Sequence, residues 1–426
     1  MIRRILLAAV CAAVLTGSAG CGKGTQKLLD SEITDFFIYG THFNLSGKLE
    51  TENPDSIDAV FMVFSSKDSE FEVPLLFDVT SRGAEYRTSD LINSGIFLDA
   101  LPAGEFRIII KVKKGETSEL YGAVNTKSFE SMEYYSLTRN GKNMKIDIVF
   151  EKDEDRQLLE IHAAETKLPL NVYDIVIDPG HGGKEFPGAE GYVDSKSYAE
   201  KDLNFEIALR FKQNLENAGY KVALTRDGDY TVPYYGEGGR ATVVNELKAK
   251  YLFSVHCNGN PSSSVHGTEI YIGNDSDPAL GSSLADRIVE ISGYRYSNLS
   301  SSEMKVADGV YNRKFKAADV RGSEETAAEY GYKPFDIPVG TNYYLVIREV
   351  GGATTGAYHD GRHVLEGENM FRNSKNTAEG LLCELGYMSN SKNLRHLLDN
   401  KAKYAEGLFR GFDEYIKLMH GQNKYQ

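Results

Sequence analysis

The chain has little cysteine, no excess of basic residues and, after its first 20 residues, no long apolar run. Only two of its four cysteines, Cys257 and Cys383, follow residue 21, which is too few for a disulfide framework. Acidic residues outnumber basic ones by 61 to 48, and no basic cluster is present. This balance argues against a nucleic-acid partner, because such partners are held by clustered basic side chains that release counterions.

The one long apolar stretch lies near the start, from Ile5 to Leu15, and follows Arg3 and Arg4. Small residues then lead to Cys21, so residues 1–20 read as an export signal that is too short to cross a bilayer as a mature helix. The run Ser-Ala-Gly-Cys resembles a bacterial lipoprotein cleavage site and predicts that Cys21 is lipidated. Plain secretion and an uncleaved anchor remain alternatives, and in every case the mature domains lie outside the cytoplasm.

Residues 21–30 read as a tether, and residues 31–152 as strand after strand. Short apolar runs alternate there with turn signals such as Asn53-Pro54-Asp55, and no long helical period intervenes. This pattern predicts a smaller all-β, sandwich-like accessory domain whose ligand is not readable. The acidic run at 151–155 indicates the end of this domain, and residues 153–171 are predicted to be a linker.

From residue 172 to residue 418, strands alternate with helices. The clearest helix is expected at about 200–218, where Leu203, Ile207, Phe211 and Leu215 are spaced by four and Gly219 follows as a stop. Further elements are expected at 222–225, 239–250 and 401–418. The order predicts an α/β catalytic domain with an open, mostly parallel, doubly wound sheet.

Three short apolar runs in this region each lead into a residue that can bind a metal or work beside one. The runs at 172–177, 251–255 and 381–383 lead to His181, His256 and Glu384, respectively. Asp178-Pro179-Gly180 lies between the first run and His181. Ligands of an open α/β sheet bind beyond the carboxyl ends of its strands, so we expect two histidines and a carboxylate to meet in one crevice.

Several motifs in a fixed order carry a resemblance to a known family. They are Ile175-Val176-Ile177-Asp178-Pro179-Gly180-His181-Gly182-Gly183, Glu200-Lys201-Asp202-Leu203-Asn204, Thr225-Arg226-Asp227, Arg240-Ala241 with Asn245, Ser254-Val255-His256-Cys257-Asn258 and Leu382-Cys383-Glu384-Leu385-Gly386-Tyr387-Met388-Ser389-Asn390. The set resembles the zinc-dependent N-acetylmuramoyl-L-alanine amidases, which cleave bacterial peptidoglycan. It spans roughly residues 172–418.

The resemblance implies one zinc ion held by His181, Glu200 and His256, with Glu384 as the catalytic carboxylate. The residue types agree, because two imidazoles and one carboxylate suit Zn²⁺ and leave a fourth position for water. The implied reaction is hydrolysis of the amide between N-acetylmuramic acid and L-alanine. Two alternatives remain: a zinc peptidase acting within the stem peptide, and an exported peptidoglycan-binding lipoprotein whose hydrolase domain is inactive or self-inhibited.

Candidate substrate contacts are Arg348, Arg240 and Asn258. Arg348 follows an apolar run and could hold a carboxylate of the stem peptide. For Arg240, as for Arg226, a structural ion pair is the alternative to a substrate contact.

The chain departs from compact family members by an insertion at about residues 294–375. Its acidic residues include Glu303, Glu324, Glu325, Glu329, Glu366 and Glu368. One hypothesis makes the helix-like stretch from Gly322 to Tyr330 a lid that places a carboxylate on zinc; the simpler interpretation is that the insertion shapes the cleft. Cys257 and Cys383 are expected to face away from His256 and Glu384, as buried apolar residues, with a disulfide or zinc ligation as alternatives.

Overall fold

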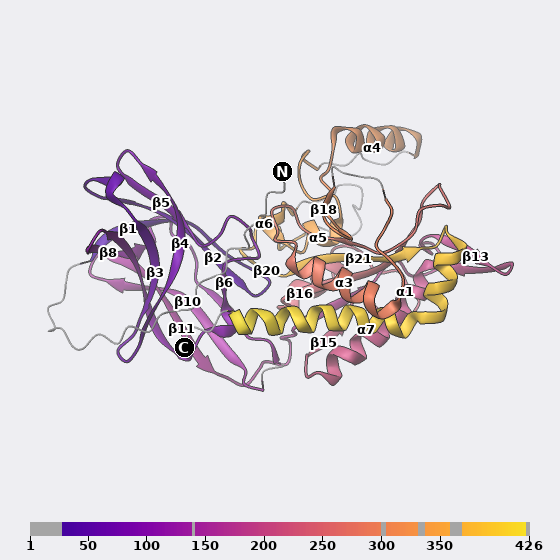
Figure 1. Cartoon of the computed structure of the whole chain (residues 1–426), viewed down its shortest axis with the longest axis horizontal. Coiled ribbons are helices and arrows are strands. Elements are labelled where there is room, and N and C mark those ends of the chain that lie inside the picture. The colour runs from indigo at the N-terminus through magenta and orange to yellow at the C-terminus, as the bar shows by residue number, and fades with distance from the viewer. Residues whose placement is uncertain (1–27, 139–140, 300–303, 331–336, 358–368, 423–426) are drawn as a thin grey trace.

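A computed structural model describes residues 28–138, 141–299, 304–330, 337–357 and 369–422. It places a β-rich N-terminal unit beside an α/β unit (Figure 1). The predicted export signal and Cys21 lie outside the described residues, as do Glu303, Glu366 and Glu368. Among the helices that are described, none combines the length and the apolar character needed to span a membrane.

The N-terminal unit is one sheet that closes on itself. Strand β1 pairs with β2 on one side and with β8 on the other, and the strands between them follow in the order β2-β5-β4-β3-β7-β8. Its strands are β1 (Leu29–Tyr39), β2 (His42–Glu50), β3 (Ala59–Ser65), β4 (Glu70–Thr80), β5 (Gly83–Arg87), β6 (Ile96–Phe97), β7 (Gly104–Lys114), β8 (Thr117–Val124), β9 (Met132–Tyr135), β10 (Met144–Asp153) and β11 (Arg156–Glu165), with β20 (Asn376–Thr377) at one edge. Two short 3₁₀ helices, η1 (Pro54–Ser56) and η2 (Leu98–Ala100), interrupt them.

The barrel-like closure corrects the predicted sandwich. Strands with one buried face alternate apolar and polar residues in both architectures, as β7 does with Phe106, Ile108, Ile110 and Val112 buried and the residues between them less so. The sequence therefore predicts the strands, whereas the pairing of β1 with β8, two strands far apart along the chain, decides between sandwich and barrel.

The β sheet also extends past its predicted end at residue 152. The acidic run contains the turn of a hairpin, in which β10 and β11 pair from Met144 with Glu165 to Asp153 with Arg156. Glu154 adopts a positive φ of 57° in this turn. An exposed hairpin turn and an exposed linker both favour charged residues, so composition alone does not separate them.

The α/β unit is built on a seven-stranded sheet with the order β15-β12-β16-β21-β17-β19-β18. The first four strands are parallel, and β17 then runs antiparallel to β21. The strands are β12 (Ile175–Pro179), β15 (Val222–Leu224), β16 (Tyr251–Asn258), β17 (Glu269–Tyr271), β18 (Lys305–Ala307), β19 (Val310–Tyr311) and β21 (Glu379–Tyr387), and a separate hairpin is formed by β13 (Glu190–Val193) and β14 (Lys196–Ala199).

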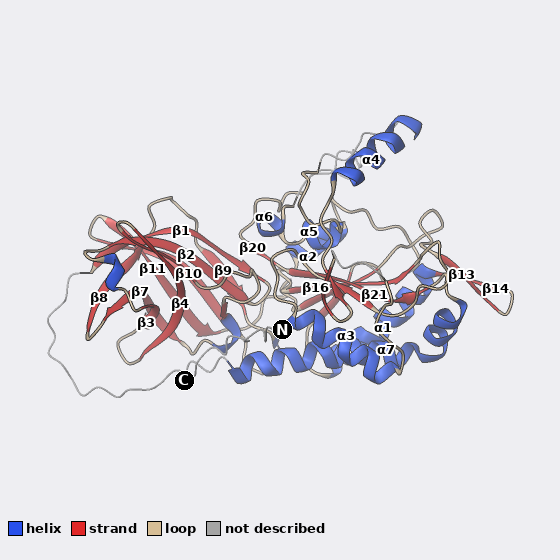
Figure 2. Cartoon of the chain, turned by 45° about the horizontal axis from the view of Figure 1, so that its top comes forward, coloured by secondary structure: helices blue, strands red, loops and turns tan. Residues whose placement is uncertain are grey.

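Helices cover both faces of this sheet (Figure 2). Side chains of α1, α3 and α7 pack with alternate residues of β12, β16 and β21 in one core, and α2 and α5 pack on the other face in a second core. The helices are α1 (Glu200–Asn217), α2 (Arg240–Glu246), α3 (Ala279–Ser292), α4 (Ala317–Tyr330), α5 (Leu345–Arg348), α6 (Gly352–Thr355) and α7 (Ser391–Gln422), which is kinked at Asn400. Burial of both faces explains why the parallel strands read as continuous apolar runs.

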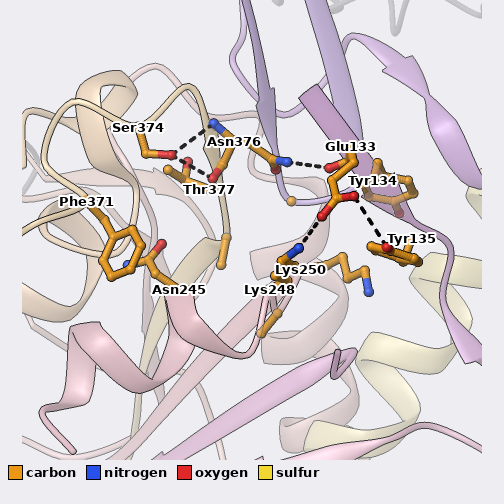
Figure 3. A pocket seen from close by; sticks show the side chains of 13 residues that line it. Glu133, Tyr134, Tyr135, Asn245, Lys248, Lys250, Phe371, Ser374, Asn376 and Thr377 are labelled. Carbon is orange, nitrogen blue, oxygen red and sulfur yellow. Dashed lines mark hydrogen bonds and ion pairs between the residues drawn. The ribbon is translucent and has the colours of Figure 1, made fainter. Parts of the chain in front are cut away.

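The two units meet at the amino ends of β16 and β21. The hydroxyls of Thr41 and Tyr251 share a buried hydrogen bond of 2.7 Å, and the Asn93 side-chain amide donates one of 2.7 Å to Glu379. A cavity of about 180 Å³ lies in this interface (Figure 3), where Asn376 donates to the Glu133 carbonyl oxygen. The β unit therefore fixes one end of the strands whose other ends carry the predicted site.

The insertion contributes β18 and β19 to the sheet edge, and α4, α5 and α6 above it. Helix α4 projects from the body of the α/β unit (Figures 1 and 2). Its Glu324 and Glu325 are exposed.

Candidate metal and catalytic site

The loop after β12 has an unusual backbone held by arginine. His181, Gly182 and Gly183 all have positive φ angles, of 61°, 135° and 76°. Positive φ is unfavourable for a histidine and persists only where its surroundings impose it. The Arg226 guanidinium imposes it in part, because it donates to the carbonyl oxygens of Pro179 and Gly180 at 2.9 and 3.2 Å. Arg226 therefore has the structural role rather than the substrate role.

A second arginine holds the same loop. Arg240 forms an ion pair with Asp178 and donates to the His181 carbonyl oxygen at 2.9 Å. Asp178 is 1% exposed and also accepts hydrogen bonds from Thr225 and Ser254. Burial would raise the pKa of Asp178, but Arg240 and the two hydroxyls outweigh burial and bring it below its usual value.

Glu200 opens α1 directly beneath this loop. Its Oε2 accepts a hydrogen bond of 2.7 Å from the Ala189 amide, and its Oε1 accepts one of 3.0 Å from the Cys257 amide. Burial would raise the pKa of Glu200, but hydrogen bonds to His181 and His256 outweigh burial, so its pKa lies well below the ordinary value. The side chain is thus a fixed carboxylate.

The structure brings His181, Glu200 and His256 together. Glu200 lies 3.2 Å from His181 Nε2 and 3.0 Å from His256 Nδ1, and one ligand atom from each residue lies within 4.8 Å of the others. This is the only such group of three found among the described residues. Two imidazoles and one carboxylate at this spacing fit a catalytic zinc ion with one position left for water.

Glu384 lies beside the triad on β21. It is paired in register with His256 on β16 and with Glu269 on β17. It is 8% exposed, and its Oε2 has no hydrogen-bond partner among the described residues. Burial first, and then the charges of Glu200 and Glu269, raise the pKa of Glu384 well above the ordinary value. An unpartnered buried oxygen of this kind is available to a substrate or a water.

Glu269 is a residue that the sequence-based prediction missed. It is fully buried, and four side chains donate hydrogen bonds to it: Asn258, Tyr271, Ser297 and Tyr387. A buried carboxylate needs such donors. The only signal in the sequence is an acidic residue inside the apolar run Thr268-Glu269-Ile270-Tyr271, which is unfavourable unless it is paired.

A cavity of about 400 Å³ opens over these residues on the side of the sheet that α2 and α5 cover. His181, His256, Glu384 and Arg240 form its polar side. Asp178, Gly182 and Thr231 also line it, and the remaining lining residues are apolar or aromatic: Phe186, Val232, Tyr234, Tyr344, Leu345, Val346 and Leu382. Tyr344, Leu345 and Val346 belong to the insertion, which therefore shapes the cleft, whereas none of the α4 side chains that the structure describes lines this cavity.

Of the three predicted substrate contacts, the structure places one in the lining of the cavity. Arg240 lines the cavity, whereas Asn258 is not among its described lining residues and donates a hydrogen bond of 3.1 Å to Glu269. Arg348 does not line the cavity: it is 1% exposed, bonds Glu349 at 2.8 Å, and donates to the carbonyl oxygens of Asn342 and Tyr343. The expectation that Arg348 faces the cleft is corrected, because a short helix, α5, turns it inward.

The two cysteines are free and buried. Both belong to the core formed with α1, α3 and α7, on the opposite face of the sheet from His256 and Glu384. The alternation predicted from the strands is confirmed, and the disulfide alternative is not formed. Burial raises the pKa of the Cys257 thiol, and neither cysteine is part of the group that could hold a metal.

Comparison with known proteins bears on this site. A family profile described as N-acetylmuramoyl-L-alanine amidase matches residues 175–414, more than half of the chain, and includes all four site residues. LytH of Staphylococcus aureus, a probable cell wall amidase, is 28% identical over 186 residues, which are 43% of this chain and 56% of that protein. The matched region thus spans little more than half of that relative.

Two solved structures were also compared. The N-acetylmuramoyl-L-alanine amidase AmiC2 of Nostoc punctiforme is 22% identical, with a TM-score of 0.36 over 58% of this chain and 98% of that one. The catalytic domain of CwlV, an N-acetylmuramoyl-L-alanine amidase from Bacillus (Paenibacillus) polymyxa, is 22% identical, with a TM-score of 0.37 over 58% and 99%.

Proposed function

Because the chain belongs to the N-acetylmuramoyl-L-alanine amidase family, we propose that it hydrolyses the amide between the lactyl group of N-acetylmuramic acid and the L-alanine of the peptidoglycan stem peptide. The observation that carries the proposal is the convergence of His181, Glu200 and His256 beside Glu384 in one cavity. Family membership indicates which bond is cleaved, and the site contains side chains able to cleave it.

His181, Glu200 and His256 would hold one zinc ion. When bound, zinc lowers the pKa of a coordinated water and polarises a carbonyl oxygen, which are the two requirements of amide hydrolysis. The chain fixes these side chains in advance: Ala189 and Cys257 orient Glu200 through their amides, while Arg226 and Arg240 hold the backbone around His181. Hydrogen bonds of this kind around a metal site set the orientation of its ligands.

Glu384 moves the proton in this proposal. Its free Oε2 accepts a proton from the attacking water and then gives it to the nitrogen of the leaving L-alanine, since one carboxyl group can act first as base and then as acid. Burial and the neighbouring charges of Glu200 and Glu269 make Glu384 hold a proton more strongly than an exposed glutamate. That affinity suits the second step, in which Glu384 carries the proton to the leaving nitrogen; the charge of a zinc ion held by Glu200 would favour the ionised form that the first step needs.

We also propose a localisation and a domain architecture for the protein. We infer export, and lipidation of Cys21, from the sequence of residues 1–21 alone. We retain the doubly wound class for the catalytic domain, supported by helices on both faces of a sheet with a parallel core. We place the end of the accessory domain after β11, at about residue 166, in place of residue 152.

Product analysis tests the proposed reaction. Zinc-loaded protein lacking Cys21 is incubated with purified peptidoglycan, and the soluble products are analysed by mass spectrometry beside a Glu384→Gln control. We expect intact stem peptides that begin with L-alanine, with the rate reduced at least about a hundredfold in the control. Peptides cut internally would instead identify a stem-peptide peptidase. The absence of any product from folded, zinc-bound protein would favour a binding role.

A further inference from the structure

Three aromatic side chains stand out on the surface because they are the only strongly exposed ones among the described residues. They are Phe186, Tyr192 and Tyr230, which are 54%, 61% and 46% exposed. All three belong to the segments that build the metal site: Phe186 and Tyr192 lie between His181 and Glu200, and Tyr230 contacts the loop of His181. Aromatic residues that are exposed together around a cleft are typical of binding surfaces.

Phe186 is part of the catalytic cavity itself. It lines the cavity together with His181, His256 and Glu384, and its carbonyl oxygen accepts a hydrogen bond of 3.0 Å from the Gly182 amide. The backbone that carries the ring is therefore fixed while the ring faces solvent.

Tyr230 is held at a second point of the same loop. Its hydroxyl donates to Asp227 Oδ1 at 3.0 Å and accepts a hydrogen bond from the Asp227 amide at 3.2 Å. Its carbonyl oxygen lies so close to Gly182 that a side chain there would clash with it. The next residue, Thr231, lines the cavity. The ring is consequently held by Asp227, on a residue whose neighbour in the chain lines the catalytic cavity.

Tyr192 stands on the β13–β14 hairpin, at the right of Figure 1. It follows Ala189, whose amide binds Glu200, by three residues, a distance of about 10 Å along an extended chain. An ion pair of 2.6 Å between Asp194 and Arg395 ties the hairpin to α7. Beside Tyr192, a second hollow of about 480 Å³ offers polar side chains of Lys392, Arg395, His396 and Asp399.

We propose that Phe186, Tyr192 and Tyr230 form a saccharide platform that binds the glycan strand of peptidoglycan next to the catalytic cavity. The inference rests on the proposed function for its choice of ligand. In that reaction the scissile amide hangs from a sugar ring, so the sugar and its neighbours must lie across the mouth of the cavity. Pyranose rings present apolar C–H faces that stack on aromatic rings, while their hydroxyl and acetamido groups need polar partners such as those beside Tyr192.

Binding to sugars without stem peptides tests the platform independently of turnover. Tetrameric N-acetylglucosamine and peptide-free glycan strands are titrated calorimetrically into zinc-loaded Glu384→Gln protein, with a free stem peptide as the competing ligand. We expect Phe186→Ala, Tyr192→Ala and Tyr230→Ala each to weaken sugar binding about three- to tenfold. Phe186→Tyr should restore binding and Phe186→Leu should not, because stacking needs a ring.

Leu209→Ala is the matched control, since Leu209 is an exposed apolar residue on α1 away from the three rings. It should bind sugar as the parent protein does. Sugar binding equal to that of the parent protein in all three alanine variants would overturn the proposal, as would binding of the stem peptide but not of the sugars. Ring-dependent sugar binding by a protein that releases no stem peptides would support the platform while refuting the proposed amidase reaction.

Discussion

Arg348 illustrates how a single buried charge can be structural although it lies in the segment that walls the cleft. Its guanidinium bonds Glu349 and two backbone carbonyl oxygens, so its removal takes the positive charge from beside a buried carboxylate and the donor from two carbonyl oxygens, although Asn369 still donates to Glu349. We expect Arg348→Ala to lower the free energy of unfolding by about 3–5 kcal/mol, as measured by urea denaturation. The KM of the remaining folded enzyme for a soluble muropeptide should not change.

Exposed Arg372→Ala is the control and should leave both quantities unchanged. A raised KM with unaltered stability in Arg348→Ala would contradict the structural role and return Arg348 to the substrate site.

The four central residues could be predicted because each one lies at or near the end of an element whose pattern is local. His181 follows β12 by two residues, His256 and Glu384 lie two and three residues before the ends of β16 and β21, and Glu200 opens a clear amphipathic helix. Arg348 and Glu269 could not be assigned in this way. The orientation of Arg348 depends on the four-residue helix α5, and that of Glu269 depends on hydrogen-bond donors from three separate segments.

At the scale of elements, the loop after β12 packs closely against β16, and this packing brings His181 near His256. A Cβ atom on Gly180 would overlap the imidazole of His256. We expect Gly180→Ala to lower zinc affinity about 10- to 100-fold, the range found when a residue that orients a metal ligand is changed. Competition with a chromophoric chelator measures this affinity. Gly322→Ala, where a Cβ meets open space on α4, should bind zinc normally. Equal affinities in the two variants would contradict this packing argument.

Helix α4 projects from the molecule, and none of its described side chains lines the cavity, which opposes the lid hypothesis. Two changes test this: the double variant Glu324→Gln and Glu325→Gln, and a separate variant in which a short linker replaces residues 320–330. We expect each to turn over a soluble muropeptide within about twofold of the parent rate, since surface changes away from the active site have small effects. Activation by either change would show that α4 restrains the enzyme.

Element types were more predictable than element partners. Alternating strands in residues 31–152 and apolar strands after residue 172 follow from burial on one face or on both. Closure of the β unit depends instead on β1 meeting β8, and the edge strand β20 comes from the distant segment Asn376–Thr377. No local pattern encodes such pairings, and the acidic turn of β10–β11 has the composition of a linker.

For the whole molecule, a buried carboxyl group joins the two units. Burial raises the pKa of Glu379 to about 8, with the Asn93 amide opposing the shift and Asp277 adding to it. Its ordinary value is 4.5, so between pH 4.5 and 8 the folded protein keeps a proton that the unfolded chain releases. The contribution to stability is complete below pH 4.5 and is lost as the pH rises toward 8.

We therefore expect Glu379→Gln, which stays neutral, to gain stability relative to the parent as the pH rises from 5 to 8, by up to about 1.4 kcal/mol per pH unit. Urea denaturation across this range measures the difference. Exposed Glu85→Gln is the control and should follow the parent. A constant difference between Glu379→Gln and the parent at all pH values would mean that the group does not titrate in the interface.

We propose that one site, made of His181, Glu200, His256 and Glu384, directs water onto the lactyl carbonyl of N-acetylmuramic acid. The most direct measurement is hydrolysis of a defined muramoyl peptide in ¹⁸O-labelled water by zinc-loaded protein, followed by mass spectrometry of both products. We expect one ¹⁸O atom in the lactyl carboxylate of muramic acid and an unlabelled peptide with a free L-alanine amino group. Label in a peptide carboxylate, with the muramoyl amide intact, would contradict it.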